Sequence, residues 1–372
     1  MLRHWGAAFA GLLMVSVPVV AVAKPAIVVE AKSGTILYSE EADHKWYPAS
    51  LTKIMTAYVT FRAIESGALK MTDKVVSSKQ SQKQAPSKIG LPLGAKLTVR
   101  TALKALIIKS ANDVAVMLAE RVAGSEAAFI ARMNKAAARL GMTRTHFVNP
   151  NGLPVAGQVT TARDMARLAR AVAKEFPQYA KMWAQPSMRL GKRRLRSYNG
   201  LLRSFKGADG MKTGFICDSG FNVVASATRD GKKIFAVVLG SRSSGQRRIR
   251  AAKLLEHGFK SHIWKTLFSA STIDSMPIDP KAAPVRSIRK TVLSWQCNPG
   301  LVSRSRSRRK GSIVRTAARL KKQRKRRKLT PQARARRLAA ARRRAAARKA
   351  RRQTVQRSRA RAAKARRTAA NQ

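Results

Sequence analysis

Acidic residues are scarce in this sequence, and cysteine and histidine are scarcer still. Only 17 Asp and Glu stand against 77 Lys and Arg among 372 residues, which gives a formal net charge of +60. This balance favours anionic partners. The two cysteines and five histidines show no zinc-ligand spacing and form no cluster. The sequence therefore predicts neither a metal site nor a cofactor.

Long apolar runs are missing after the N-terminus, which excludes further membrane-spanning helices. The one such run, residues 5–22, follows Arg3 and His4 and ends in Ala-Val-Ala, a small-x-small cleavage pattern. We predict a signal peptide over residues 1–23 and export to the periplasm, and an uncleaved membrane anchor is the alternative. In an exported protein Cys217 and Cys297 can form a disulfide, although the sequence leaves their separation open.

The last part of the chain has no acidic residue at all. Residues 301–372 hold 30 of the 77 basic residues, together with many alanines and few large apolar side chains. Such a segment cannot bury enough apolar surface to fold alone, so we predict a disordered basic tail. Its expected partners are anionic lipids, lipopolysaccharide or peptidoglycan carboxylates, and a solvated tail without a dedicated partner is the alternative. Nucleic acid is not expected as a partner of an exported protein.

Periodicity predicts strands at both ends of a largely helical middle. The expected strands are residues 26–30, 35–39, 220–228 and 232–239, the last two joined at Asp230-Gly231 by a two-residue hairpin turn. Helices are expected at residues 50–64, 99–122 (interrupted near 109–112), 126–140, 161–174 and 247–259. One sheet must then combine distant parts of the chain, which predicts an α/β (α+β) domain over residues 24–265. Residues 266–300, rich in Pro and Ser, are expected to be a linker or a remnant second domain.

Three short motifs carry the expected chemistry. The first, Ser50-Leu51-Thr52-Lys53, begins a helix, where residues three apart lie on one face. A serine hydroxyl is a weak nucleophile until a base takes its proton. Lysine is such a base when burial or another cation destabilises its ammonium form. A capping serine with a solvated lysine is the purely structural interpretation.

The second and third motifs are Ser110-Ala111-Asn112 and Lys212-Thr213-Gly214. Ser110 and Asn112 interrupt an apolar helical pattern, so their polar side chains need partners. A hydroxyl there can relay protons, and an amide can hold a peptide bond. Lys212 and Thr213 can bind a carboxylate, and Gly214 leaves room for substrate beside the strand. Without a catalytic role, the two motifs would be a helix-to-helix turn and a polar strand end.

In this order and at these separations the motifs resemble those of the penicillin-binding protein and serine β-lactamase superfamily. The surrounding segments 47–56, 108–113, 147–153, 161–166 and 209–215 resemble D-alanyl-D-alanine carboxypeptidases of low molecular mass. The resemblance covers residues 25–259 and not the tail. It implies a β-lactamase/transpeptidase-like fold, with a five-stranded antiparallel sheet flanked by helices.

The resemblance also implies a role for each motif. Ser50 would attack the penultimate D-Ala carbonyl of a peptidoglycan stem peptide, with Lys53 as base and Ser110 as proton relay. The substrate-binding residues would be Asn112, Lys212, Thr213, Gly214 and Phe215, with the backbone amides of Ser50 and Phe215 forming an oxyanion hole. β-Lactam antibiotics would acylate Ser50.

Some positions depart from the family pattern, and further functions stay open. Ile216 stands where Thr is usual, followed by Cys217, and Tyr198 and Asn151 replace Arg and His of some relatives. Endopeptidase action on D-Ala cross-links would use the same site. A β-lactamase also stays open, although no convincing Glu-x-x-x-Asn segment occurs. A third open alternative is a catalytically weak penicillin-binding protein that tethers the envelope through its tail.

Overall fold

Strand-forming segments from both ends of the chain build one antiparallel sheet. The computed structural model describes residues 25–268, 271–294, 296–300 and 339. The sheet has the order β2-β1-β9-β8-β7, which confirms the five-stranded expectation. Its strands are β1 (Ala26–Glu30), β2 (Ile36–Glu40), β7 (Ala208–Ile216), β8 (Gly220–Arg229) and β9 (Lys232–Ser241). The predicted signal peptide (1–23) lies outside the described residues, and so does the predicted tail (301–372) apart from Ala339.

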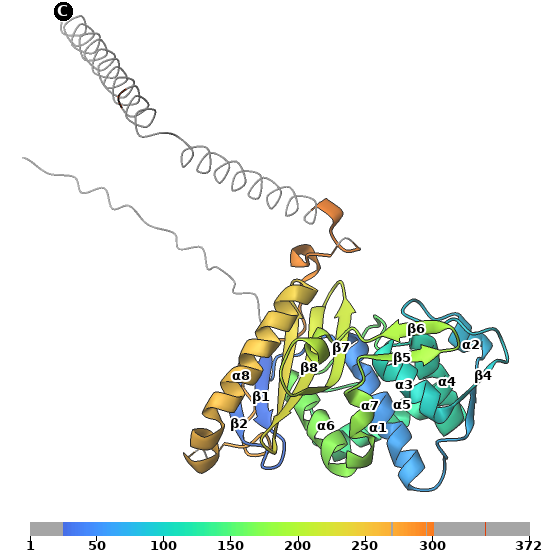
Figure 1. Cartoon of the computed structure of the whole chain (residues 1–372), viewed down its shortest axis with the longest axis horizontal. Helices are drawn as coiled ribbons and strands as arrows, with labels where there is room; N and C mark the ends of the chain where they lie inside the picture. The colour runs from blue at the N-terminus through green and yellow to red at the C-terminus, as the bar shows by residue number, and fades with distance from the viewer. Residues whose placement is uncertain (1–24, 269–270, 295, 301–338, 340–372) are drawn as a thin grey trace, which may run out of the picture. The chain divides into compact units, whose positions relative to one another are not determined.

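Helices cover both faces of the sheet (Figure 1). The longer ones are α1 (Thr52–Glu65), α3 (Val99–Ile108), α4 (Asn112–Ala123), α5 (Glu126–Arg139), α6 (Ala162–Glu175) and α8 (Ser244–Phe268). Shorter elements are η1 (Ala49–Leu51), β3 (Lys74–Val76), α2 (Lys79–Gln82), β4 (Lys96–Thr98), η2 (Pro177–Tyr179), α7 (Ala180–Trp183), β5 (Ser187–Leu190), β6 (Arg193–Arg196), η3 (Gly200–Arg203) and η4 (Arg289–Thr291). None of the described helices is long and apolar enough to cross a membrane.

Strand side chains alternate between two apolar layers, because successive residues of a strand point to opposite faces. In β1, Ile27 and Val29 join the layer that contains α1, α3, α4 and α6. Ala26 and Val28 join the smaller layer under α8, which contributes Leu254 and Leu255. Residues on both faces of the sheet are therefore apolar, which explains the near-continuous hydrophobic runs in its strands.

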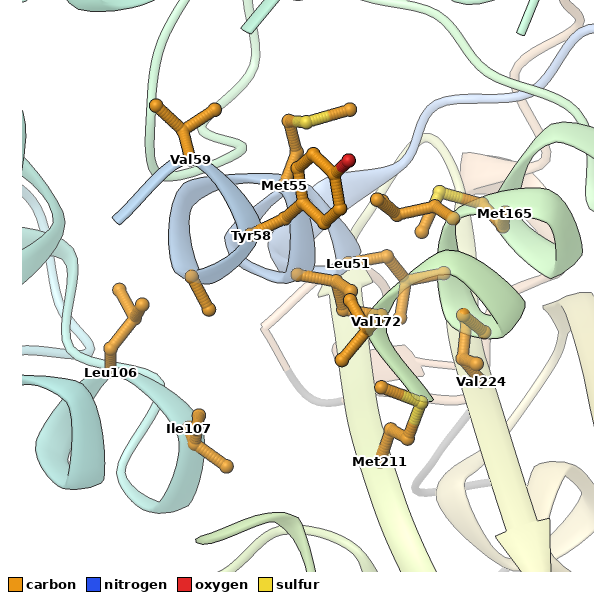
Figure 2. Packing of buried hydrophobic residues seen from close by; sticks show 14 of the residues in the cluster. Leu51, Met55, Tyr58, Val59, Leu106, Ile107, Met165, Val172, Met211 and Val224 are labelled. Carbon is orange, nitrogen blue, oxygen red and sulfur yellow. The ribbon is translucent and has the colours of Figure 1, made fainter. Parts of the chain in front are cut away.

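Helix α1 lies in the middle of the larger layer and carries the first motif at its start. Met55 and Tyr58 are fully buried, as are nearly all α1 residues from Thr52 to Phe61. Figure 2 shows these side chains beside Met165 and Val172 of α6, with Leu106 of α3 across from them. Packing on several sides fixes the helix, so the residues at its N-terminus have a rigid base.

The helix boundaries follow the sequence in the middle of the chain and depart from it at α8. The predicted break near residues 109–112 separates α3 from α4, and Thr161 caps α6 by accepting a hydrogen bond from the Asp164 amide at 3.0 Å. Helix α8 is longer at both ends than the expected 247–259. Its final turns carry exposed side chains such as Trp264 and Phe268, so the buried periodicity ends before the helix does.

The segment after α8, expected to be a linker or a remnant domain, packs along the sheet and α6. Thr272 forms a bridge to Thr35, and Ile273 is fully buried. Arg163 of α6 forms a buried ion pair with Asp43 at 2.6 Å and also donates hydrogen bonds to the carbonyl oxygens of Met276 and Pro277. The compact unit consequently extends to Pro299, and the expected boundary at residue 265 falls inside α8.

Farther along, the same segment covers the β7–β8 turn. Ile288 and Val292 are buried, and Arg289 pairs with Asp218 of the turn at 2.8 Å. Cys217 of the turn forms a disulfide with Cys297, 80 residues later. The structure thereby settles the pairing that the sequence left open.

The disulfide predicts a measurable share of stability. Crosslinking across a loop of this length removes chain entropy from the unfolded state equivalent to about 4.5 kcal/mol. We expect Cys217→Ser combined with Cys297→Ser to lower the free energy of unfolding by up to about that amount in guanidinium denaturation. Dithiothreitol should destabilise the native chain to a similar degree and leave the double variant unchanged. Equal stability of the oxidised native chain and the double variant would contradict this prediction.

Candidate active site

The three motifs of the sequence meet beside the middle of β7. Ser50 lies in η1, directly before α1, and Lys53 lies in the first turn of that helix. Ser110 and Asn112 occupy the α3–α4 junction, and Lys212 lies in β7. Two non-glycine residues here, Ala49 and Ser110, have left-handed φ values of 49° and 60°. Such conformations are costly outside glycine and are often found at functional sites.

The Lys53 amine is surrounded by three hydrogen-bond partners. Its Nζ lies 3.0 Å from Ser50 Oγ and 2.7 Å from Asn112 Oδ1, and it also donates to the Asn151 carbonyl oxygen. The amide and carbonyl oxygens can only accept. When Lys53 is neutral, its two N–H groups are held by these two oxygens, and its lone pair faces the Ser50 hydroxyl. This is the geometry of a base placed to take the serine proton.

Burial makes that neutral state accessible. The Lys53 side chain is 0% exposed, and burial lowers its pKa well below the usual value for lysine. The charge of Lys212 lowers it further, whereas Asp113 opposes the shift. Lys212 is also buried, and its pKa falls to about 7, first through burial and then through the charge of Arg247. The charge of Lys212 thus helps to keep Lys53 unprotonated.

Ser110 and Lys212 form a second serine–lysine pair. Lys212 Nζ donates hydrogen bonds to Ser110 Oγ at 2.8 Å and to the Thr213 carbonyl oxygen at 2.8 Å. Ser110 is 5% exposed, so little water competes for its hydroxyl. The pair lies close enough to Lys53 for the charge of Lys212 to act on it.

Asn112 has both ends of its amide engaged within the protein. Its Oδ1 accepts from Lys53, and its Nδ2 donates to the Ala85 carbonyl oxygen at 2.8 Å. The sequence suggested that this amide grips substrate. In the structure it orients Lys53 and holds the loop that precedes Ser87, whose carbonyl accepts from the Asn112 backbone amide.

Gly214 brings β7 against the nucleophile segment. A Cβ at this position would lie 2.9 Å from the Pro48 carbonyl oxygen and 3.2 Å from the Leu51 amide nitrogen. Glycine is thus required here by the close approach of the backbone of residues 48–51, whereas its role toward substrate stays a prediction. Phe215 follows and stacks on Phe221 with ring centroids 4.2 Å apart. The backbone amides of Ser50 and Phe215 therefore belong to two adjoining segments, as an oxyanion hole requires.

Three contributors were not assigned from the sequence. The Asn151 backbone carbonyl binds Lys53, and a backbone atom leaves no signal in a side-chain motif. Arg247 of α8, 8% exposed, acts on Lys212 through its charge. Tyr198, singled out for another reason, accepts a hydrogen bond from Lys109, next to Ser110, at 3.0 Å. Among the described residues, no group of three His, Cys, Asp or Glu is placed to hold a metal ion.

The fold and the paired serine–lysine sites are those of the penicillin-binding and transpeptidase-like proteins. A family profile described as D-alanyl-D-alanine carboxypeptidase, peptidase S11, matches residues 14–243. The chain belongs to this family.

Curated relatives agree with this assignment. D-alanyl-D-alanine carboxypeptidase DacF of Bacillus subtilis is 34% identical over 245 residues, which cover 64% of this chain and 63% of the relative. DacC of Escherichia coli is 38% identical over 241 residues, covering 63% and 60% respectively. The chain thus spans about three fifths of the length of these relatives.

Solved structures agree with the fold. The D-alanyl-D-alanine carboxypeptidase DacD from Francisella tularensis is 30% identical, with a TM-score of 0.62 over 68% of this chain and 74% of that one. Penicillin-binding protein D2 from Listeria monocytogenes, solved in its ampicillin-bound form, is 32% identical, with a TM-score of 0.57. That match covers 63% of this chain and 96% of the Listeria chain.

Gly152 offers a test of how tightly the nucleophile is positioned. Its φ is +82°, and a Cβ would lie 1.9 Å from the Ala49 carbonyl oxygen. We expect Gly152→Ala to displace the Ser50 turn and to slow acylation by a fluorescent penicillin about 100-fold.

Gly157 supplies the matched control. Its φ is +83°, but a Cβ there would meet only the Val148 side chain, at 3.8 Å. Gly157→Ala should lose about 1 kcal/mol of stability through backbone strain and keep its acylation rate. Equal acylation rates in both variants would show that the Ala49–Gly152 contact does not position Ser50.

Proposed function

We propose that this protein is a serine-type carboxypeptidase that removes the terminal D-alanine from peptidoglycan stem peptides. The observation that carries the proposal is the Lys53 amine, buried and held by two acceptors so that its lone pair faces Ser50. Family membership supports the substrate, since the matching relatives are D-alanyl-D-alanine carboxypeptidases by name.

The first step is acylation of Ser50. Lys53 takes the hydroxyl proton as Oγ attacks the carbonyl of the penultimate D-Ala, and the amides of Ser50 and Phe215 stabilise the oxyanion. The C–N bond then breaks, and Ser110 relays the proton held by Lys53 to the nitrogen of the leaving D-Ala, which leaves Lys53 neutral and Ser110 protonated for the hydrolytic step. Lys212 and Thr213 bind the terminal carboxylate of the substrate. Water hydrolyses the acyl-enzyme and regenerates Ser50.

β-Lactams are expected to trap this acyl-enzyme, because their strained amide occupies the place of the scissile bond. The ampicillin-bound form of the similar Listeria protein supports this expectation. We also propose that the protein acts in the periplasm. The Cys217–Cys297 disulfide supports an oxidising compartment, where such bonds persist. The predicted basic tail would then dock to anionic envelope polymers.

The direct test uses a labelled penicillin and a pentapeptide that ends in D-Ala-D-Ala. The native protein should form a covalent adduct and release D-alanine. Ser50→Ala should form no adduct and lower the release rate by at least about 10³-fold. Ser66→Ala, at the exposed far end of α1, serves as the control and should behave as native. A native protein that neither binds penicillin covalently nor releases D-alanine would refute the proposal, and rapid penicillin turnover would favour a β-lactamase.

The pH dependence of acylation gives a second prediction. Above pH 7 Lys212, with a pKa of about 7, loses the charge that attracts a carboxylate. Acylation by a penicillin should therefore rise with pH as Lys53 loses its proton and then fall above about pH 7. A penicillin methyl ester lacks the carboxylate, so its much slower acylation should show no alkaline fall. Identical alkaline limbs for the acid and the ester would contradict this role of Lys212.

A further inference from the structure

The β5–β6 hairpin is unusually basic and lies beside the active site. Residues 187–196 contain five Lys or Arg and no carboxylate, and no Asp or Glu occurs anywhere between residues 176 and 208. All five basic residues are exposed. The hairpin was not expected from the sequence, because Arg and Lys interrupt the apolar alternation of its strands.

Strand pairing places like charges against each other. Met188 pairs with Leu195, and both are buried, so this face of the hairpin holds it to the protein. The next pair, Arg189 with Arg194, is directly opposite on the other face. Like charges at facing positions destabilise a sheet. Folding therefore gains nothing from these two charges.

About half of the described arginines outside the hairpin have a carboxylate partner. Arg121 pairs with Asp73 at 3.0 Å, for example, and Arg229 with Glu256 at 2.9 Å. The ten ion pairs recorded within the described part of the chain include no hairpin residue. With only 17 acidic residues in the chain, the hairpin has kept its charges unneutralised.

A second acid-free stretch meets the hairpin next to the catalytic groups. No Asp or Glu occurs from residue 74 to residue 112, and the loop between α2 and α3 contributes Lys83, which is exposed. Arg193 donates a hydrogen bond to the Ile89 carbonyl oxygen of this loop at 2.9 Å. Lys109 donates to Tyr198, which follows β6. Figure 1 shows β5 and β6 beside α3, whose end leads into Ser110.

We propose that this basic face, formed by Arg189, Lys192 and Arg194, binds carboxylates of the substrate peptide that lie before its D-Ala-D-Ala end. The proposal rests on the proposed function and adds a preference for acidic peptides. A site for an acidic segment of the substrate must adjoin the catalytic groups. The hairpin does so because Tyr198, two residues after β6, accepts a hydrogen bond from Lys109, the neighbour of Ser110. The charges of this face have no carboxylate partner in the described part of the chain, so a carboxylate of a ligand can pair with them. Such a role accounts for the unfavourable pairing of Arg189 with Arg194.

The test compares two pentapeptides that share the D-Ala-D-Ala end and differ by glutamate or glutamine at the second position. At low salt the native protein should show a KM about three- to tenfold lower for the glutamate peptide, with equal kcat. Arg189→Gln combined with Arg194→Gln should remove this difference. Added salt should also reduce it, because exposed charges are screened.

The matched control is Lys253→Gln combined with Lys260→Gln, two exposed residues of α8. It removes the same net charge and should keep the preference, which separates the hairpin from the general basicity of the chain. An unchanged preference in the hairpin variant, or an equal loss in the control, overturns the proposal.

A binding measurement keeps this inference separate from the catalytic one. If the native protein cleaves neither peptide, the proposed function fails. Fluorescence anisotropy with labelled peptides then tests separately whether the basic face binds acidic peptides. Tighter binding of the glutamate peptide that depends on Arg189 and Arg194 supports the face. Equal binding of both peptides refutes it.

Discussion

The desolvation of two lysines is the constraint on which the site depends. Lys53 and Lys212 are fully enclosed, and removing an ammonium group from water is unfavourable unless it is neutralised or well hydrogen-bonded. The direct hydrogen-bond partners are oxygens of neutral groups and not carboxylates: those of Ser50, Asn112 and Asn151 around Lys53, and those of Ser110 and Thr213 around Lys212. Neutral acceptors satisfy the N–H groups without restoring the high pKa that a carboxylate would confer. Burial of Lys53 costs folding stability, and the same burial leaves its amine neutral and able to act as a base.

That constraint explains the tight backbone contacts around the nucleophile. A base is effective only at hydrogen-bond distance, so η1 must be fixed against its neighbours. Gly152 and Gly214 let their backbones approach the backbone of residues 48–51 more closely than a Cβ would allow. Ala49, in this contacted segment, has a left-handed φ. Burial of α1 on several sides then prevents Ser50 from drifting. The positioning thus comes from close packing and from glycines rather than from ion pairs.

Much of this could be predicted from the sequence because it is encoded locally. The apolar, β-branched-rich runs in residues 220–239 and the Asp230-Gly231 turn between them give β8 and β9, and the spacing of Ser50 and Lys53 gives their contact. The missing parts depend on distant contacts or on backbone atoms. The Asn151 carbonyl, the Cys217–Cys297 pairing and the packing of residues 271–300 leave no local pattern. The β5–β6 hairpin was missed because its exposed arginines obscure the apolar pair Met188 and Leu195.

Substrate carboxylates link the two buried lysines, Lys53 and Lys212, to the basic face of the β5–β6 hairpin in the proposed reaction. In the proposed reaction, a substrate carboxylate beside Lys212 stabilises the charged form of that lysine and so raises its pKa above 7. A charged Lys212 in turn disfavours a proton on Lys53, whose pKa it already lowers. Substrate binding therefore shifts the pair toward one arrangement, with Lys212 charged and Lys53 neutral. Carboxylates farther along the peptide would be held by Arg189 and Arg194, outside this buried pair, where water screens their effect on its protonation. In the proposed reaction the buried Lys212 and the exposed arginines would therefore bind different carboxylates of one substrate, Lys212 next to the bond that is cleaved and the arginines farther along the peptide.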